Sequence, residues 1–290
     1  KAITAADVAW LQGHRAAPMG KAELAVLEPL ARLSRYLDKP ASSAGDVCAR
    51  VRSYQRTSAF ADLAVLQLRR ALAASAHHHD AARMVLAAVR ERRDQENRLF
   101  AEVLAGAYEG ALHWHGVTPL HRVWKRAVAP VWEADPGARL YLVVLDGCSY
   151  PVFLELLHAL SQDAVFPLGI RPDREGTVAG MPALAPLPTI TSHARGALFQ
   201  GDLPQDSLVA EILFRDHDEA KTDKARFKAN TALGNRSRSL FLKGDLTDGG
   251  QGLLSALSDE ELDVVAAVFN AVDDQIGSSN TGAVVRLTPE

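Results

Sequence analysis

The sequence has very few of the residues that build disulfide-bonded or zinc-finger proteins. Only two of its 290 residues are cysteine, Cys48 and Cys148, and they lie far apart without a Cys-x-x-Cys pair. Neither a disulfide scaffold nor a structural zinc site is indicated, and a reducing, cytoplasmic compartment is expected.

Long apolar runs are missing as well. No segment approaches the roughly 20 consecutive apolar residues that a membrane-spanning helix requires, and residues 1–10 lack the apolar core of a signal peptide. The sequence therefore predicts a protein without a membrane segment. Hydrophobic residues still make up 48% of the chain, which at this length is enough for one or two domains with buried cores.

Charge is divided unevenly along the chain. Residues 1–138 hold 19 Lys and Arg against 14 Asp and Glu, a net charge of +5, whereas residues 139–290 hold 13 against 21, a net charge of −8. The first half is rich in Ala, Leu and Arg, with apolar residues at helical spacing, as in the run from Leu24 to Ala31. We predict a helical domain over residues 1–135 and a different domain over residues 136–290.

Near residue 136 the pattern changes from helical periodicity to continuous apolar runs of strand length. Leu140–Leu145 and Val264–Phe269 have the pattern of strands that are buried on both faces. We expect helices and strands to alternate between them, in a mostly parallel sheet with the first run as a central strand. The elements expected in between are a helix at Pro151–Leu160, a strand at Phe166–Ile170, an extended connection at 171–188, helices after Thr191 and at Asp206–Phe214, and a polar surface loop with some helix at Arg215–Arg238.

Two of these strands end in acidic residues. Asp146 follows the first run, and Asp273 and Asp274 follow the second. Open α/β sheets bind ligands at the carboxyl ends of their strands, and carboxylates on one sheet edge could hold two divalent metal ions for phosphoryl or sulfuryl transfer. The alternative interpretation is local: Asp146 caps the helix that follows it, and Asp273 and Asp274 form a turn.

A third motif places hydroxyl groups at the expected start of a helix. It reads Pro-Thr-Ile-Thr-Ser-His-Ala-Arg and covers residues 188–195, so a phosphoryl oxygen near Thr191 would meet free backbone N–H groups. A threonine hydroxyl becomes a useful nucleophile beside a metal ion, and Arg195, one helical turn later, could clamp an oxyanion. The alternative is structural, with Thr191 or Ser192 as a helix cap and Arg195 solvated.

Together these motifs resemble the alkaline-phosphatase superfamily, and more closely the PglZ family of bacteriophage-exclusion (BREX) defence systems. The resemblance covers residues 90–290, and the order of the motifs gives most of its specificity. The segments that carry it are Val143–Ser149, Leu187–Gly201, Phe241–Leu246, Val268–Asp274 and, in the helical half, Glu96–Glu102.

The resemblance implies an alkaline-phosphatase-like α/β domain, of which residues 136–290 are the N-terminal part. It implies that Asp146, Thr191, Asp273 and Asp274 bind divalent metal ions, with two zinc ions in the complete domain. Thr191 would attack phosphorus while Arg195 steadies the transferred group. The implied activity is metal-dependent hydrolysis of phosphodiesters or phosphomonoesters in anti-phage defence, and the implied partners are other BREX or Pgl defence proteins and DNA.

Two departures from the family pattern lead to a second interpretation. Gly277 stands four residues after Asp273, where the superfamily often has a further ligand, and no Asp-His pair follows Asp274. We therefore expect the chain to be a segment of a longer protein, and residues 1–290 alone to show little metal-dependent hydrolysis. The alternative function is a catalytically inert phosphatase-like scaffold that docks other defence proteins or nucleic acid.

The helical half carries arginines that have two interpretations, among them Arg90, Arg92, Arg93 and Arg98. They could contact nucleic-acid phosphates, or they could be solvated helix faces and ion pairs. The three consecutive histidines at residues 77–79 are expected at a solvated turn, because consecutive residues of a helix point in different directions.

Overall fold

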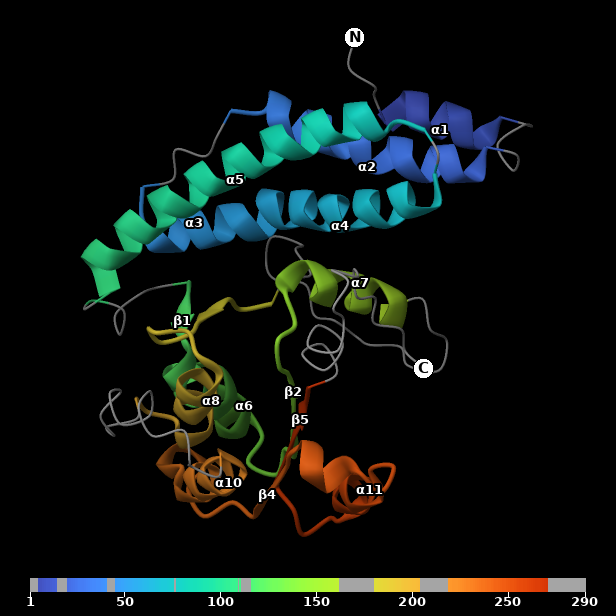
Figure 1. The fold of residues 1–290 in the computed structure, drawn as a ribbon. Helices are drawn as coiled ribbons and strands as arrows, with labels where there is room; N and C mark the ends of the chain where they lie inside the picture. The colour runs from blue at the N-terminus through green and yellow to red at the C-terminus, as the bar shows by residue number, and fades with distance from the viewer. Residues whose placement is uncertain are drawn as a thin grey trace. The chain divides into compact units, whose positions relative to one another are not determined.

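A computed structural model describes residues 5–14, 20–40, 45–75, 77–108, 110, 116–161, 180–203 and 219–270. The fold is mixed α/β and mostly helical, with two small parallel sheets, as the sequence indicated (Figure 1). In the described part of the chain, no helix combines the length and the apolar character needed to cross a membrane.

The chain divides into two compact units. The helical unit contains residues 1–109, 149–180 and 281–290, and the sheet unit contains residues 110–148 and 181–280. These compact units have other bounds than the domains predicted from the sequence, 1–135 and 136–290. The two sequence domains stay a prediction.

The helical unit is built on three long helices that pack side by side (Figure 1). These are α2 (Lys21–Asp38), α4 (Ala59–Ala74) and α5 (His79–Ala107), and they agree with the helical spacing of the sequence. Their apolar stripes meet in a core that includes Val26, Leu33, Leu68 and Val89. The other elements of this unit are α1 (Ala5–Gly13), α3 (Val47–Ser53), a π-helical turn (Tyr54–Ser58) and α7 (Tyr150–Ser161).

Between these helices lies a polar network centred on Glu96 of α5. Its carboxylate accepts hydrogen bonds from the Tyr36 hydroxyl at 2.9 Å and the Ser58 hydroxyl at 2.8 Å, and it forms ion pairs with Arg92 and Arg93. Burial by itself would raise the pKa of Glu96, but these four donors outweigh it, so the pKa lies below its usual value. The network therefore favours the folded state while Glu96 is ionised.

We expect Glu96→Gln to lower the free energy of unfolding by about 2 kcal/mol at pH 7, since hydrogen bonds to a charged group are lost. Because the folded pKa of Glu96 is depressed, its contribution is present above the unfolded pKa and is lost as the pH falls through the folded pKa. Urea unfolding followed by circular dichroism between pH 3 and 7 checks this.

The difference in the free energy of unfolding between wild type and Glu96→Gln should shrink towards zero at the acid end of this pH range. The comparison with wild type is needed because the pKa of the nearby Asp62 shifts in the opposite direction: burial raises it despite Arg93. The stability contributed by Asp62 therefore changes with pH in the opposite sense, and it cancels in the difference. A difference that stays constant with pH would mean that Glu96 contributes to stability only through its shape.

The sheet unit contains a three-stranded parallel sheet with the order β2-β5-β4. Strands β2 (Leu140–Leu145) and β5 (Val264–Phe269) coincide with the two predicted runs, and β4 (Arg238–Phe241) pairs with the other side of β5. In the described sheet β5 lies between β2 and β4, and the central position predicted for Leu140–Leu145 stays a prediction, because the strand expected at Phe166–Ile170 lies outside the described residues. Tyr141 and Val143 of β2 are exposed, which a continuous apolar run does not reveal.

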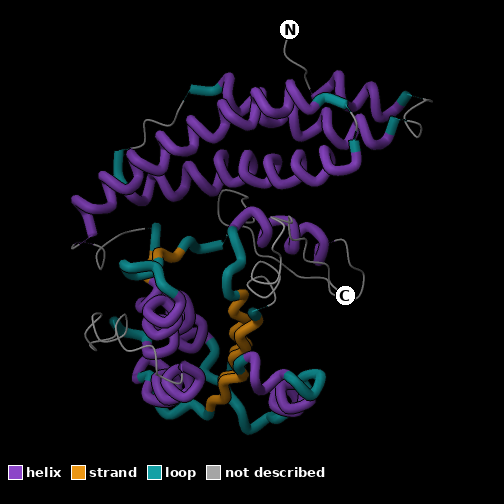
Figure 2. Tube along the Cα trace, in the orientation of Figure 1, coloured by secondary structure: helices purple, strands orange, loops and turns teal. Residues whose placement is uncertain are grey.

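Helices cover both faces of this sheet in Figure 2. Alternate residues of β5, Val264, Ala266 and Val268, pack into a core with Trp124, Phe199 and Phe227, and α11 contacts the other face. The described helices of this unit are α6 (Ala129–Ala134), α8 (Thr191–Gln200), α10 (Glu219–Ala229) and α11 (Gln251–Ser258). Its described short elements are β1 (Thr118–Pro119), β3 (Ala183–Leu184), the 3-10 turns at Leu120–Arg122, Thr231–Leu233 and Lys243–Leu246, and a π-helical turn at Trp124–Val128.

Several predicted elements agree with this fold and others lie outside the described residues. The predicted helix at Pro151–Leu160 is α7, and the helix expected after Thr191 is α8. The strand expected at Phe166–Ile170 and the helix expected at Asp206–Phe214 lie outside the described residues.

Candidate functional site

Asp146 lies at the carboxyl ends of β2 and β5. Its backbone N–H donates to the Phe269 carbonyl at 3.0 Å, and its Oδ2 accepts from the Asn270 side chain at 3.4 Å. Because the two strands are parallel, their ends meet at one sheet edge, as the sequence predicted. The interpretation of Asp146 as a purely local cap is wrong, since Oδ2 faces residues distant in sequence.

Helix α8 begins at Thr191, as predicted from the motif. Ile190 is the residue before its first turn and makes no side-chain cap, so neither Thr191 nor Ser192 caps the helix. Thr191 is exposed, and within the described residues its hydroxyl makes no hydrogen bond. No side-chain cap covers the first turn of α8, and the start of a helix is a place where an anion can bind.

The other end of α8 is fixed by side chains from elsewhere in the sheet unit. Trp124 Nε1 donates to the Leu198 carbonyl at 2.5 Å, and Asn230 Nδ2 donates to the Phe199 carbonyl at 2.8 Å. The helix ends at Gly201, whose φ of 71° is left-handed and costs glycine little. These contacts satisfy carbonyls that a helix end leaves open, and they hold α8 in place.

Arg195 joins α8 to Asp146 and to α10. Its Nη1 donates to Asp146 Oδ2 at 3.0 Å, while Nε and Nη2 donate to Asp223 Oδ2 at 2.9 and 2.5 Å. The three side chains are 12%, 14% and 3% exposed respectively, so this is a mostly buried triad. The alternative in which Arg195 is merely solvated is wrong.

The charges of this triad determine what it can bind. Burial by itself would lower the pKa of the Arg195 guanidinium, but Asp223 and Asp146 outweigh it, so the pKa lies above its usual value and Arg195 stays charged. Two carboxylates share one guanidinium, so the formal charges of these three side chains sum to −1. Such a cluster attracts a cation, whereas an anion alone would be repelled from the Asp146 side.

Asp223 is the residue that sequence reasoning missed. It lies on α10, in the stretch 215–238 that was expected to be a polar surface loop with some helix. The helix is present, but Asp223 and Phe227 are both buried at 2% exposure, so this part of the stretch is not a surface loop. Phe227 could have indicated that Asp223 is buried, because a large apolar residue four positions later lies on the same helix face.

Not all predicted site residues can be compared with the structure. Asp273, Asp274 and Gly277 lie outside the described residues. In the described part of the chain, no group of three or more His, Cys, Asp or Glu side chains is placed to hold a metal ion. Among the described residues Asp146, engaged by the Arg195 guanidinium, does not form a metal site.

The histidines have different positions. His77, His78 and His79 are exposed around the start of α5, as expected. His193 is buried on α8, between Thr191 and Arg195.

No family model matches this chain, and no curated protein matches it either. The resemblance to the PglZ family therefore remains a prediction from the motifs.

Proposed function

We propose that the sheet unit belongs to a metal-dependent phosphoesterase of anti-phage defence, which hydrolyses phosphodiesters or phosphomonoesters. The observation that supports this best is the ion pair between Asp146 and Arg195. It joins two motif residues 49 positions apart, and it lies at the sheet edge where α/β proteins bind ligands. Local caps and turns give no reason for this contact.

Each residue of the site has a role in this proposal. Asp146, together with Asp273 and Asp274, would hold divalent metal ions, which would activate the Thr191 hydroxyl and neutralise phosphate charge. Thr191 would attack phosphorus from the first turn of α8, where backbone N–H groups receive phosphoryl oxygens. Arg195 would orient the phosphoryl group, and Asp223 would hold the guanidinium in place.

The negative charge of the triad gives a test that needs no turnover. We expect phenylphosphonate, a phosphoryl group that is not hydrolysed, to bind residues 1–290 only when zinc is present, because the triad alone repels anions. Asp146→Asn should weaken zinc binding at least about tenfold, since one ligand loses its charge. Isothermal titration calorimetry of zinc, and of phenylphosphonate with and without zinc, measures both effects.

Glu260→Gln is the matched control, because it neutralises an exposed carboxylate of the same unit. It should leave both affinities unchanged. Phosphonate binding that is equally tight without zinc would contradict the metal-dependent proposal. A chain that binds neither zinc nor phosphonate would instead be the inert scaffold that docks other defence proteins or nucleic acid.

A further inference from the structure

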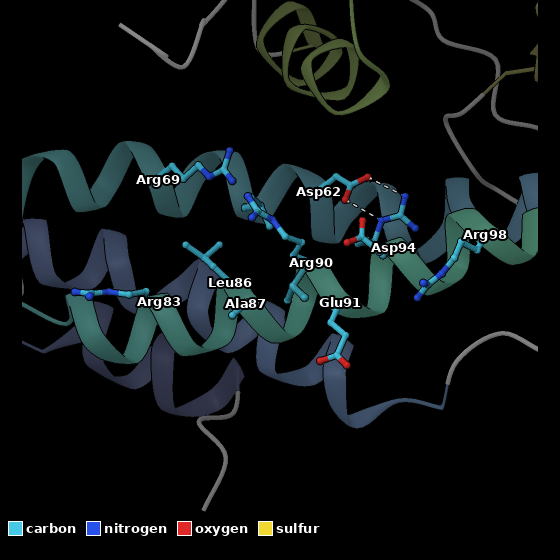
Figure 3. A pocket seen from close by; sticks show the side chains of 12 residues that line it. Asp62, Arg69, Arg83, Leu86, Ala87, Arg90, Glu91, Asp94 and Arg98 are labelled. Carbon is cyan, nitrogen blue, oxygen red and sulfur yellow. Dashed lines mark hydrogen bonds and ion pairs between the residues drawn. The ribbon is translucent and has the colours of Figure 1, made fainter. Parts of the chain in front are cut away.

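A groove of about 670 Å³ runs between α4 and α5 of the helical unit (Figure 3). It is independent of the triad, since all of its lining residues belong to the helical unit. The residues that line it are Asp62, Val65, Arg69, Arg83, Leu86, Ala87, Val89, Arg90, Glu91, Arg93, Asp94 and Arg98.

Four exposed arginines follow this groove. Arg83, Arg90 and Arg98 come from α5 and Arg69 comes from α4, as Figure 3 shows. The spacings of seven and eight residues place the three α5 arginines on one helix face, spread over roughly 22 Å at 1.5 Å per residue. The groove therefore presents a row of cations rather than a single point charge.

Among the described residues, three of these four arginines make no direct ion pair, although acids also line the groove. Arg69, Arg90 and Arg98 have no ion-pair partner in the described part of the chain, and the pair of Arg83 with Asp80 is highly exposed on both sides and therefore weak. The acid on the α4 side, Asp62, is already paired with Arg93.

Two exposed carboxylates, Glu91 and Asp94, also line the groove. Asp94 lies four residues after Arg90 and four before Arg98, on the same helix face. The lining holds five arginines against three acids, Asp62, Glu91 and Asp94, so the groove keeps a formal charge of +2.

The length of the row argues for an extended partner. One phosphate or one nucleotide cannot contact guanidinium groups spread over about 22 Å, whereas this distance corresponds to six or seven base pairs at 3.4 Å each. Guanidinium groups also bind phosphate oxygens in pairs, which suits a chain of phosphates.

The apolar content of the groove argues against an acidic protein as the partner. Of its apolar side chains, Val89 is buried, Val65 and Leu86 are half-buried, and only the small Ala87 is exposed. A protein interface needs an apolar centre, whereas interfaces with nucleic acid are polar and positively charged.

We propose that this arginine groove, defined by Arg69, Arg83, Arg90 and Arg98, binds the phosphate backbone of duplex nucleic acid without reading its base sequence. The contacts are electrostatic and independent of sequence, so the affinity falls steeply with salt.

Fluorescence anisotropy with a labelled 20-base-pair DNA duplex of mixed sequence tests the proposal on residues 1–290. We expect R90Q/R98Q to weaken binding about tenfold at 50 mM salt. Its plot of log K against log salt should also be shallower by roughly 2, since each lost phosphate contact removes about 0.9. Asp94→Asn should tighten binding two- to threefold, roughly, because it removes a like charge from the row.

The matched control is R32Q/R52Q, which removes two exposed arginines of the same unit outside the groove. It should leave the salt slope unchanged. Equal losses in the two double variants, absence of duplex binding, or a slope that R90Q/R98Q does not alter would each overturn the proposal. Displacement of the labelled duplex by polyglutamate as readily as by unlabelled duplex would assign the groove to an acidic protein partner instead.

Discussion

Arg195→Met is expected to lower the free energy of unfolding of the sheet unit by about 3–5 kcal/mol. The substitution removes the guanidinium that faces Asp223, a carboxylate with only 3% of its side chain exposed, and removing one partner of a buried ion pair costs this much. Urea unfolding followed by tryptophan fluorescence measures the change, because the buried Trp124 and Trp132 report on this unit.

The double variant R195M/D223L separates the cost of a buried carboxylate that has lost the Arg195 guanidinium from the cost of the lost Arg195 side chain. Replacing a whole buried ion pair by apolar residues is often nearly neutral, so the double variant should recover at least about half of the loss. The loss of Arg195 should affect Asp146 less than Asp223, because Asp146 Oδ1 keeps the hydrogen bond from the Gly147 N–H at 3.0 Å. A loss below about 1 kcal/mol in Arg195→Met would show that the triad is solvated, and Arg195 would then not be fixed as the proposed site requires.

The sequence predicted the periodic elements well because their patterns are local. Helices α2, α4 and α7 and strands β2 and β5 each carry a spacing or an apolar run that one segment displays by itself. The neighbours of a strand are not local information. The run at β2 looked buried on both faces, yet in the described sheet it lies at the edge, with Tyr141 and Val143 exposed.

The residues of the candidate site were likewise predicted only where a local motif marks them. Asp146 and Arg195 were identified because each stands in a motif, after a strand or inside the first turns of a helix. The rule that parallel strands deliver their ends to one edge predicted the place of Asp146, but the ion pair with Arg195 was not predicted. Asp223 stands in no motif, and its role arises only because α10 packs against α8, a tertiary contact that a polar helix sequence does not display.

Phe227→Ala is the last prediction, and it concerns how packing positions the site. Arg195 and Phe199 are four residues apart on α8, and Asp223 and Phe227 are four apart on α10, so an ion pair and an aromatic contact lie one helical turn apart between the two helices. Phe227 is 2% exposed, and its ring lies 5.9 Å from that of Phe199 and 6.0 Å from that of Trp124. Truncation to alanine leaves a cavity and should cost about 3–5 kcal/mol, whereas Phe227→Leu, the matched control, should cost about 1.5 kcal/mol or less.

The coupling between the two contacts is the more informative measurement. If the aromatic contact holds α10 at the distance that the ion pair needs, then Phe227→Ala also weakens the bonds between Arg195 and Asp223. The double variant R195M/F227A should then lose less stability than the two single variants together, by about 0.5–3 kcal/mol, as for residues that share an interface. Additive losses, measured by urea unfolding under the same conditions, would mean that the ion pair forms without help from the core. Arg195 would then be positioned by its two carboxylates alone, and core substitutions behind α8 would leave phosphonate binding unchanged.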